Sequence, residues 1–286
     1  MKKTASLLFL LFATITQLFS QAPKSSLLWA ISGNDLQKPS YIFGTFHIMC
    51  KEDFSISPIL KSKLRATKQF YGELKMDDPS MQQQLALKMA MKGQTMQSLL
   101  DAKEYKEVSD SFQRITGLPF MLFNNFKPFM TLSVLTIKSI SCSDIVQPET
   151  EFVSLAKENK LPILGLETID DEMHAIDKQP LDSQVNSLKQ MILNFDSIKT
   201  ETKKMIAVYN KRNIDSIYRF ASGSGMDGNF ERDFVITRNK NWMPVIKKAM
   251  KEKETFFAVG AGHLGGKEGL LNLLRTQGYK VTPVKF

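Results

Sequence analysis

The sequence predicts an α/β fold, with a central mixed sheet built from two strand-GxxH-helix-strand units and a large, mostly helical middle region. Three observations support this prediction. Short segments rich in β-branched and aromatic residues lie near both ends of the chain. Two of them, 41–43 and 255–259, run directly into a Gly-x-x-His motif. Across 77–143, the apolar residues recur instead at helical spacing.

The first half of the chain begins with a predicted β-hairpin of strands 27–31 and 41–43, because turn-forming residues separate them. A short helix over 58–66 then leads into a third strand over 69–74. In the helical stretch that follows, Pro128 is a good first-turn residue. The apolar positions of this stretch are Leu85, Met89, Met96, Leu99, Leu100, Met130, Val134, Ile137 and Ile140.

In the second half, a helix over 151–159 feeds a strand over 162–166, which repeats the helix-to-strand order. The apolar residues that follow have the spacing of one buried helix face: Leu181, Val185, Leu188, Ile192 and Phe195. A glycine-rich segment over 223–228 is predicted to be a mobile loop. The last unit consists of a strand over 255–259, a helix over 267–276, Gly278 as its cap and a strand over 281–284.

The N-terminus is predicted to be a secretory signal peptide. Two lysines precede an apolar run over 7–13, and small residues offer cleavage after Ser20 or Ala22. A retained membrane anchor is the weaker interpretation, because the run is shorter than the roughly 20 apolar residues that span a bilayer. We therefore expect export to the periplasm or the extracellular space, without a stable membrane span. The expected organisation is a signal peptide over 1–20 and one domain over 27–284, with helical insertions at about 77–145 and 170–250.

The chain is basic, with 38 lysines and arginines against 29 acidic residues and a formal net charge of +9 at pH 7. The basic residues are interleaved with acidic ones, and no unbroken basic block or aromatic-basic RNA-binding motif occurs. Nucleic acid is therefore not an expected partner. We interpret the charge as solvated faces, with a weak attraction to anionic envelope surfaces as the minority interpretation.

Two cysteines in an exported protein form a disulfide, remain free thiols or bind a metal. His47 and Cys50 have the spacing of a His-x-x-Cys ligand pair. A Cys50–Cys142 disulfide is the favoured interpretation, because thiolate metal sites usually contain more than one cysteine. Such a bridge would fix the loop after His47 to a distant segment.

The chain has only three histidines, and two of them, His47 and His263, close the Gly-x-x-His motifs. Both follow predicted strands, and ligands of α/β sheets bind outside the carboxyl ends of strands. These two histidines are therefore candidates for a functional site, although a single histidine after a strand is more often structural. His174 lies among acidic residues, and we interpret it as an exposed helical residue.

The turn over 260–265 also matches the Gly-x-Gly-x-x-Gly motif of dinucleotide-binding proteins. That motif requires an acidic residue about 20 positions further on. Here that place is occupied by Val284, Lys285 and Phe286, which end the sequence. We therefore do not expect NAD, whereas a phosphate at the N-terminus of the following helix stays open.

Two carboxylates occupy places comparable to those of the histidines. Glu73 lies near the end of one predicted strand, and Glu167 follows another. An acid among apolar residues needs a partner, so we expect a metal or an arginine nearby, and Arg238 is a candidate. The alternative for Glu73 is a surface position beside Lys75, and for Glu167 a local role beside the capping residue Thr168.

Four motifs together resemble those of the TraB/GumN family, to which the Tiki proteins are related. The motifs are Tyr41-Ile42-Phe43-Gly44-Thr45-Phe46-His47, Gly165-Leu166-Glu167-Thr168, Arg238-Asn239-x-x-Trp242, and Val259-Gly260-Ala261-Gly262-His263-Leu264 through Gly278-Tyr279-x-Val281. The resemblance runs from about Leu27 to Val284. It implies an α/β domain in which two Gly-x-x-His motifs face one pocket, proposed in the Tiki branch to act as a metal-dependent protease. The implied site residues are His47, His263, Glu73, Glu167 and Arg238.

The main functional hypothesis is an exported metal-dependent hydrolase, most plausibly a peptidase acting on a peptide or small-molecule envelope substrate. His47, His263 and Glu73 would bind one divalent cation, with zinc, manganese and cobalt not distinguished. The remaining acid, Glu167, would act as general base, and Arg238 would steady negative charge. The sequence leaves the oligomeric state open.

Three alternatives use the same residues. One is a metal-free, esterase-like hydrolase in which His47 is the base and Glu73 orients it. Another is a binding protein for a metal, an envelope ligand or haem, with an apolar wall supplied by Phe43, Phe46, Phe256 and Phe257. In the third, the motifs only brace the sheet.

Overall fold

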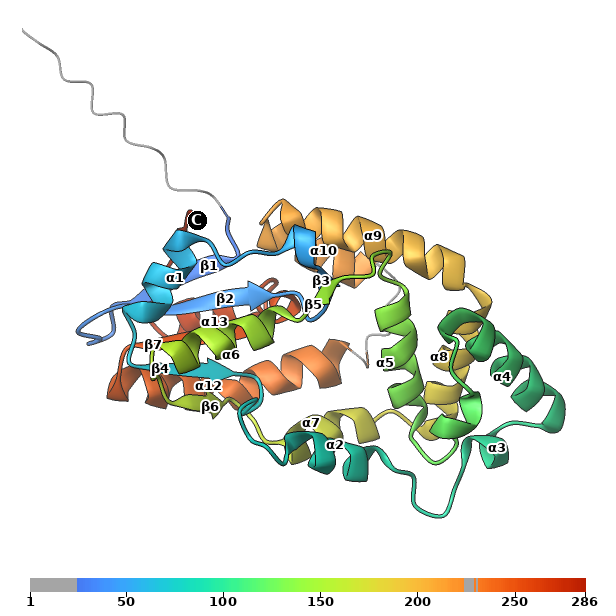
Figure 1. The fold of residues 1–286 in the computed structure, drawn as a ribbon. Coiled ribbons are helices and arrows are strands. Elements are labelled where there is room, and N and C mark those ends of the chain that lie inside the picture. The colour runs from blue at the N-terminus through green and yellow to red at the C-terminus, as the bar shows by residue number, and fades with distance from the viewer. Residues whose placement is uncertain (1–24, 224–228, 230) are drawn as a thin grey trace, which may run out of the picture.

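A computed structural model describes residues 25–223, 229 and 231–286 (Figure 1). The predicted signal peptide and most of the predicted loop over 223–228 therefore lie outside the described residues. The predicted α/β class is confirmed, since helices surround a central mixed sheet (Figure 1). No helix in the described ranges has the length and apolar character needed to cross a membrane.

The central sheet has six strands within the described part of the chain, in the order β6-β4-β7-β2-β1-β8. These strands are β1 (Leu28–Ser32), β2 (Ser40–Thr45), β4 (Gln69–Gly72), β6 (Ile163–Gly165), β7 (Thr255–Gly260) and β8 (Lys280–Val284). Strands β6, β4, β7 and β2 are parallel to one another, and β1 runs antiparallel to both β2 and β8. The carboxyl ends of the four parallel strands therefore meet at one edge.

The two predicted strand-GxxH-helix-strand units are present and interlock. In the first, β2 leads through α1 (Pro58–Arg65) to β4, and in the second, β7 leads through α13 (Leu270–Thr276) to β8. Strand β7 of the second unit lies between β2 and β4 of the first, and β2 of the first unit lies between β7 and β8 of the second. Helix α13 begins three residues later than predicted, after the glycine-rich turn, and Gly278 caps it with a positive φ of 88° as expected.

Helices cover both faces of the sheet (Figure 1). On one face lie α1 and α6 (Pro148–Glu158), where Phe152 packs against Phe43 and Phe256 with ring centroids 5.0 and 5.5 Å apart. On the other lie α12 (Thr237–Glu252) and α13, and Trp242 of α12 is fully buried there. Helix α6 starts three residues before the predicted helix, because Pro148 suits the first helical turn.

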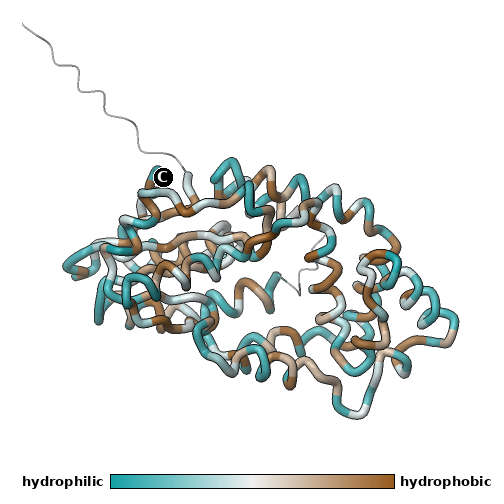
Figure 2. The backbone as a smooth tube through the Cα atoms, viewed as in Figure 1, coloured by the Kyte–Doolittle hydropathy of each residue, from teal (hydrophilic) through white to brown (hydrophobic). Residues whose placement is uncertain are grey.

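The middle of the chain forms further helices, as predicted, but in several short pieces. They are α2 (Met81–Met89), α3 (Met96–Leu99), α4 (Ala102–Thr116), the 3₁₀ turn η2 (Phe120–Phe123), α5 (Pro128–Lys138), α7 (Ile169–Asp177), α8 (Leu181–Leu193), α9 (Phe195–Asn210) and α10 (Ile214–Gly223). Helices α3, α4, α5 and α8 enclose an apolar cluster of their own, separate from that of the sheet (Figure 2). The predicted apolar stripe is split between two helices: Val185 and Leu188 are buried on α8, and Phe195 begins α9.

The predicted disulfide is present between Cys50 and Cys142, with Cα atoms 5.9 Å apart. It reinforces a small antiparallel pair formed by β3 (Met49–Cys50) and β5 (Ile145–Val146). The cysteines therefore serve neither as free thiols nor as metal ligands. The bridge holds the segment after His47 against the segment that leads into α6.

Candidate active site

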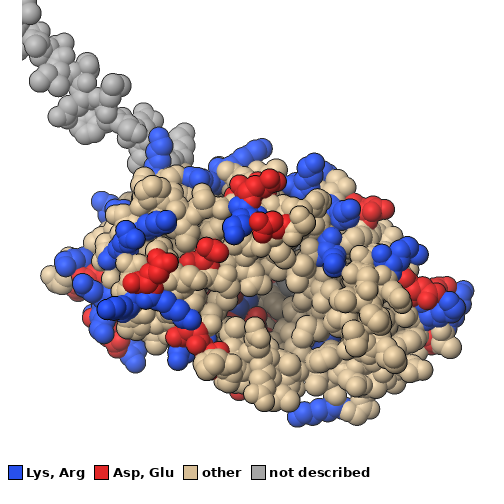
Figure 3. Space-filling view, in the orientation of Figure 1, with Lys and Arg blue, Asp and Glu red and all other residues tan. Residues whose placement is uncertain are grey.

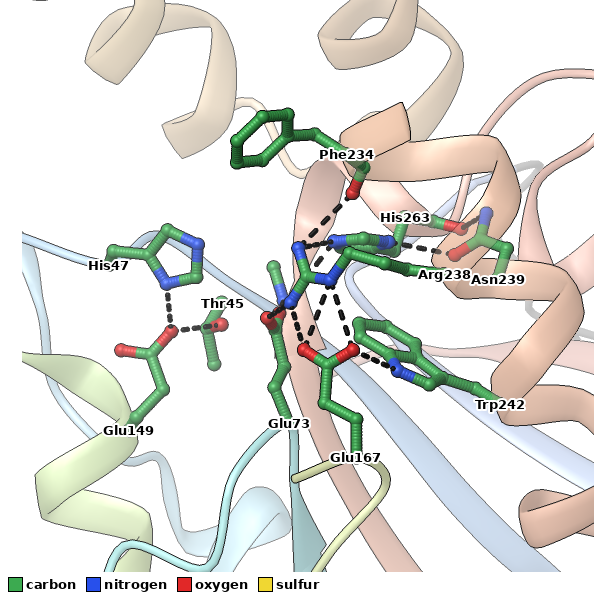
Figure 4. A network of polar contacts seen from close by, with 11 residues as sticks. Thr45, His47, Glu73, Glu149, Glu167, Phe234, Arg238, Asn239, Trp242 and His263 are labelled. Carbon is green, nitrogen blue, oxygen red and sulfur yellow. Dashed lines mark hydrogen bonds and ion pairs between the residues drawn. The ribbon is translucent and has the colours of Figure 1, made fainter. Parts of the chain in front are cut away.

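The sequence-predicted site residues converge at the carboxyl edge of the sheet (Figure 4). His47 follows β2, Glu73 follows β4, Glu167 follows β6 and His263 follows β7. These are the four parallel strands, so their ends bring together side chains that are far apart in the sequence. Arg238 reaches the same place from α12, just beyond a π-helical turn over Glu231–Ile236.

Arg238 joins the two predicted acids. Its side chain is only 9% exposed, and its Nη2 donates to Oε2 of Glu73 at 2.8 Å. Its Nε donates to Oε1 of Glu167 at 3.0 Å, and its Nη1 donates to the carbonyl of Phe234 at 3.1 Å. Trp242 donates to the other oxygen of Glu167 at 2.9 Å. The expectation that each buried acid has a partner is met by the arginine.

Glu73 is ionised, and the space between it and His47 is open. The backbone N–H of Gly260 donates to its Oε1 at 2.7 Å. Burial raises the pKa of Glu73, but His263, Arg238, His47 and this N–H together lower the pKa to about 2. A Cβ at Gly260 would lie 3.1 Å from Nε2 of His47 and 3.3 Å from Oε1 of Glu73. Glycine at the strand end therefore keeps the space between these two side chains free.

His263 is a buried, neutral imidazole with a defined tautomer. Its Nδ1 lies 2.7 Å from Oδ1 of Asn239, whose amide nitrogen already donates to two backbone carbonyls. Nδ1 of His263 must therefore donate, so Nε2 carries the lone pair and accepts a hydrogen bond from Nη1 of Arg238 at 3.4 Å. Burial, helped by the charges of Arg238 and His47, lowers the pKa of His263 to about 3 against the opposing effect of Glu73. Nε2 points toward the site, 3.9 Å from Oε1 of Glu73.

His47 is oriented by a residue that the sequence did not reveal. Its Nδ1 lies 2.8 Å from Oε1 of Glu149, which also accepts a hydrogen bond from the Thr45 hydroxyl at 2.6 Å. The His47 side chain is 66% exposed at the rim of the site. Partial desolvation lowers its pKa, but Glu149 and, more weakly, Glu73 raise the pKa to about 9. Glu149 is buried in the first turn of α6. A glutamate after a helix-starting proline is common, so this position gave no distinctive signal.

Replacing Glu149 with glutamine should lower the pKa of His47 from about 9 toward 6.5, because the amide accepts the same hydrogen bond without the charge. The wild-type pair raises the pKa above its unfolded value, so it stabilises the fold fully below about pH 6.5 and ceases to do so above about pH 9. An NMR titration of the His47 ring measures the shift. Glu151→Gln, exposed on the same helix, is the matched control. An unchanged His47 pKa in the Glu149 variant would contradict the assignment.

Further residues of the site were also missed as functional candidates. Asn239 and Trp242 belong to a motif quoted above, but the sequence gave no role to either. Glu172, on α7, was interpreted only as one of the acidic neighbours of His174. Burial raises its pKa to about 7, and the charges of Glu73 and Glu167 add to this effect while Arg238 opposes it. Glu172 thus contributes a carboxyl group that titrates near neutral pH.

A hollow opens on the face of the molecule shown in Figure 3, with charged atoms visible at its depth. Glu167 lines a pocket of about 350 Å³ between the segments that follow β4 and β6. Through Gln84 this pocket adjoins a larger groove of about 830 Å³ along α2 and α7. His174 is exposed on α7, as predicted, and lines that groove.

The side chains of His47, His263 and Glu73 carry donor atoms of the kinds that bind divalent metal ions. Among the described residues, no three His, Cys, Asp or Glu side chains form a group that could hold a metal ion. However, the 3.9 Å between Nε2 of His263 and Oε1 of Glu73 is less than twice a metal–ligand distance of about 2.1 Å. Both histidines bond an outer partner through Nδ1, as metal-ligating histidines do. Of these donors, Nε2 of His263 and Oε1 of Glu73 are therefore close enough to share one ion.

Haem fits less well. Phe43, Phe256 and Phe257 were expected to supply an apolar wall, but all three are buried within the core of the sheet. Only Phe46 of that set is partly exposed.

The chain is similar in sequence to a known protein family. A model of the TraB/PrgY/gumN family matches residues 27–283. The chain belongs to the TraB/PrgY/gumN family. The resemblance inferred from the four motifs is thereby confirmed. No solved structure matches this TraB/PrgY/gumN chain.

Distant relatives of this TraB/PrgY/gumN chain are named metalloproteases. Metalloprotease TIKI2 of Danio rerio is 21% identical over 320 residues, which cover 92% of this chain and 61% of that protein. Metalloprotease TIKI1 of Homo sapiens is 22% identical over 319 residues, covering 91% and 62%. The Metalloprotease TIKI homolog of Nematostella vectensis is 20% identical over 322 residues, covering 91% and 67%. The chain thus spans about three fifths of the length of the first two relatives.

Proposed function

We propose that this chain is an exported metal-dependent hydrolase that cleaves peptides. The observation that carries the proposal is the convergence of His47, His263 and Glu73, with both rings fixed by outer partners. The relatives named metalloproteases support the same class of reaction. Export is proposed from the N-terminal sequence, and the disulfide is consistent with an oxidising compartment.

His47, His263 and Glu73 are the residues that would hold one divalent cation, either zinc, manganese or cobalt. When bound, such a cation supplies a Lewis acid and a water molecule of lowered pKa. His263 already presents a neutral ring, whereas His47 would have to lose its second proton to bind the cation.

Each of the remaining charged groups, Arg238, Glu167 and Glu172, has a separate proposed role. Arg238 is placed to stabilise negative charge that develops on a substrate carbonyl oxygen. Both oxygens of Glu167 are engaged by Arg238 and Trp242, so we assign Glu167 to positioning the guanidinium rather than to the general-base role first expected. Glu172 suits that role better, because a pKa of about 7 allows it to accept and return a proton near neutral pH.

We propose that the substrate chain lies in the pocket beside Glu167 and extends into the groove along α2 and α7. The lining supports a peptide, because it combines apolar side chains with amides that both donate and accept hydrogen bonds. Leu87, Met91 and Leu181 supply the apolar part, and Gln94 and Gln179 are among the amides.

Chelation tests the proposal. The protein purified without chelator should contain a divalent metal by elemental analysis and should hydrolyse labelled, denatured casein. Treatment with EDTA should remove both the metal and the hydrolysis, and one of zinc, manganese or cobalt should restore both. The proposal fails if the metal-loaded protein cleaves no peptide, or if hydrolysis persists after the metal is gone.

Persistent hydrolysis without metal would favour the second candidate, a metal-free hydrolase with His47 as base. The observation behind it is the 2.8 Å contact between His47 and Glu149. Glu149, rather than the Glu73 expected from the sequence, would then orient the base.

A further inference from the structure

The two edges of the central sheet differ in charge. The carboxyl edge holds the acids of the candidate active site, namely Glu73, Glu149, Glu167 and Glu172. At the opposite edge, where the parallel strands begin, the turns and helix ends are rich in lysine. Blue side chains accordingly predominate at the left end of Figure 3, where α1 and the start of β2 lie in Figure 1.

We call the lysine-rich surface the basic pole. Its basic residues are Lys38, Lys61, Lys63, Arg65, Lys68, Lys157, Lys160, Lys247, Lys248, Lys251, Lys253 and Lys280. The acidic residues on the same segments are Asp35, Glu158, Glu252 and Glu254. All of the basic residues are exposed or half-buried, and the side chains of Lys38 and Lys248 are 68% and 77% exposed.

Local helix chemistry accounts for only part of this charge. Lysines in the last turn of a helix interact favourably with its dipole, which explains residues such as Lys63 and Lys251. Lys68, Lys160 and Lys253 lie outside the helices. The helix dipole therefore does not account for them in the same way. Within the pole, the ion pairs formed among described residues join Lys38 to Glu254 at 3.4 Å and Lys248 to Glu252 at 3.9 Å. The pole therefore keeps a large excess of positive charge.

We propose that the basic pole docks the protein on an anionic phospholipid surface and turns the active-site edge away from it. A lysine near such a surface contributes about 1 kcal/mol, and the attraction acts within a Debye length of about 10 Å at 0.1 M salt. Several lysines on one end of the molecule therefore suffice for reversible binding. Because the lysines are concentrated at one end, they also orient the molecule as it approaches.

Two features favour a lipid surface over nucleic acid. The pole consists of helix ends and turns, whereas the groove and pocket described above lie on other segments. The sequence also lacks the aromatic-basic motifs that stack on bases. Ile59 lies on α1 beside pole residues, but the other exposed large apolar side chains among the described residues are on segments without pole lysines: Leu87, Leu118, Met121, Leu122, Ile145 and Leu193. The attachment is thus electrostatic and does not depend on catalysis.

The test is sedimentation of the full chain with vesicles of phosphatidylglycerol and phosphatidylcholine in equal parts. The wild-type protein should bind at low salt and dissociate at high salt. The variant Lys61→Gln, Lys68→Gln, Lys251→Gln, Lys253→Gln should lower the partition coefficient by roughly a thousandfold, at about 1 kcal/mol for each lysine. Pure phosphatidylcholine vesicles measure any binding through the apolar N-terminal stretch, which the variant leaves intact.

A matched control removes four lysines from the helices on the other side of the molecule: Lys138→Gln, Lys199→Gln, Lys203→Gln and Lys211→Gln. It has the same net charge as the pole variant and should bind almost as well as the wild type. Equal loss in both variants would overturn the proposal, because net charge alone would then explain binding. Binding that depends on the pole lysines but occurs with double-stranded DNA and not with the vesicles would also overturn it.

Discussion

Replacing Arg238 with methionine should lower the free energy of unfolding by about 3–5 kcal/mol. The guanidinium contacts Glu73 at 2.8 Å and Glu167 at 2.5 Å in a site where all three side chains are at most 14% exposed. Without it, two buried carboxylates face each other unpaired, and the cost of leaving them so exceeds the gain of an apolar side chain. Denaturant unfolding followed by circular dichroism measures the change.

Two further variants make the Arg238 result specific. Lys240→Met, on the same helix, breaks an exposed ion pair with Glu268 and should cost less than about 1 kcal/mol. Adding Glu73→Gln and Glu167→Gln to the Arg238 variant should restore much of the lost stability, because the unpaired charges are then gone. If Arg238→Met and Lys240→Met were equally stable, the central role of this ion network would be refuted.

Changing both His47 and His263 to alanine should abolish metal binding and peptide hydrolysis. Removal of an outer partner alone typically weakens metal affinity by about 10–100-fold, so loss of two direct ligands should exceed a hundredfold. Metal content by elemental analysis and hydrolysis of labelled casein are the two measurements. The fold should survive, because Arg238 still pairs with Glu73 and Glu167.

His174→Ala is the matched control for the double histidine variant, since His174 is an exposed histidine on α7. It should leave the metal content unchanged; hydrolysis is not part of this control, because His174 lines the proposed substrate groove. Full metal content and activity in the His47, His263 double variant would eliminate these histidines as ligands. A loss of stability alone, with metal binding retained, would instead favour the view that the motifs only brace the sheet.

Much of the fold could be predicted because its signals are local. The strand segments, the two Gly-x-x-His turns and Gly278 as a helix cap all depend on residues within a few positions of one another. The strand-end position of His47 and His263 was predictable for the same reason. Boundaries were less accurate where a glycine-rich turn delayed α13 or where Pro148 allowed an earlier start to α6.

Arg238 was a predicted candidate partner of the acids, although 165 positions separate it from Glu73. The partner of His47 could not be predicted in the same way, since Glu149 is 102 positions away from it. Glu149 has the sequence signature of an ordinary helix start, so nothing near it in the chain indicates that it is buried against a histidine. Glu172 looked like a solvated acid, and only its burial in the folded protein raises its pKa to about 7, against the opposing charge of Arg238.

The sequence by itself therefore determined which side chains stand at strand ends, because hydrophobic periodicity and glycine turns act between near neighbours. Only the tertiary structure decided which of those side chains meet, which histidine is neutral and which acid is held by the arginine. The order β4-β7-β2 and the parallel register set these contacts, and the pKa of each group then follows from its burial and from charges brought in by distant segments.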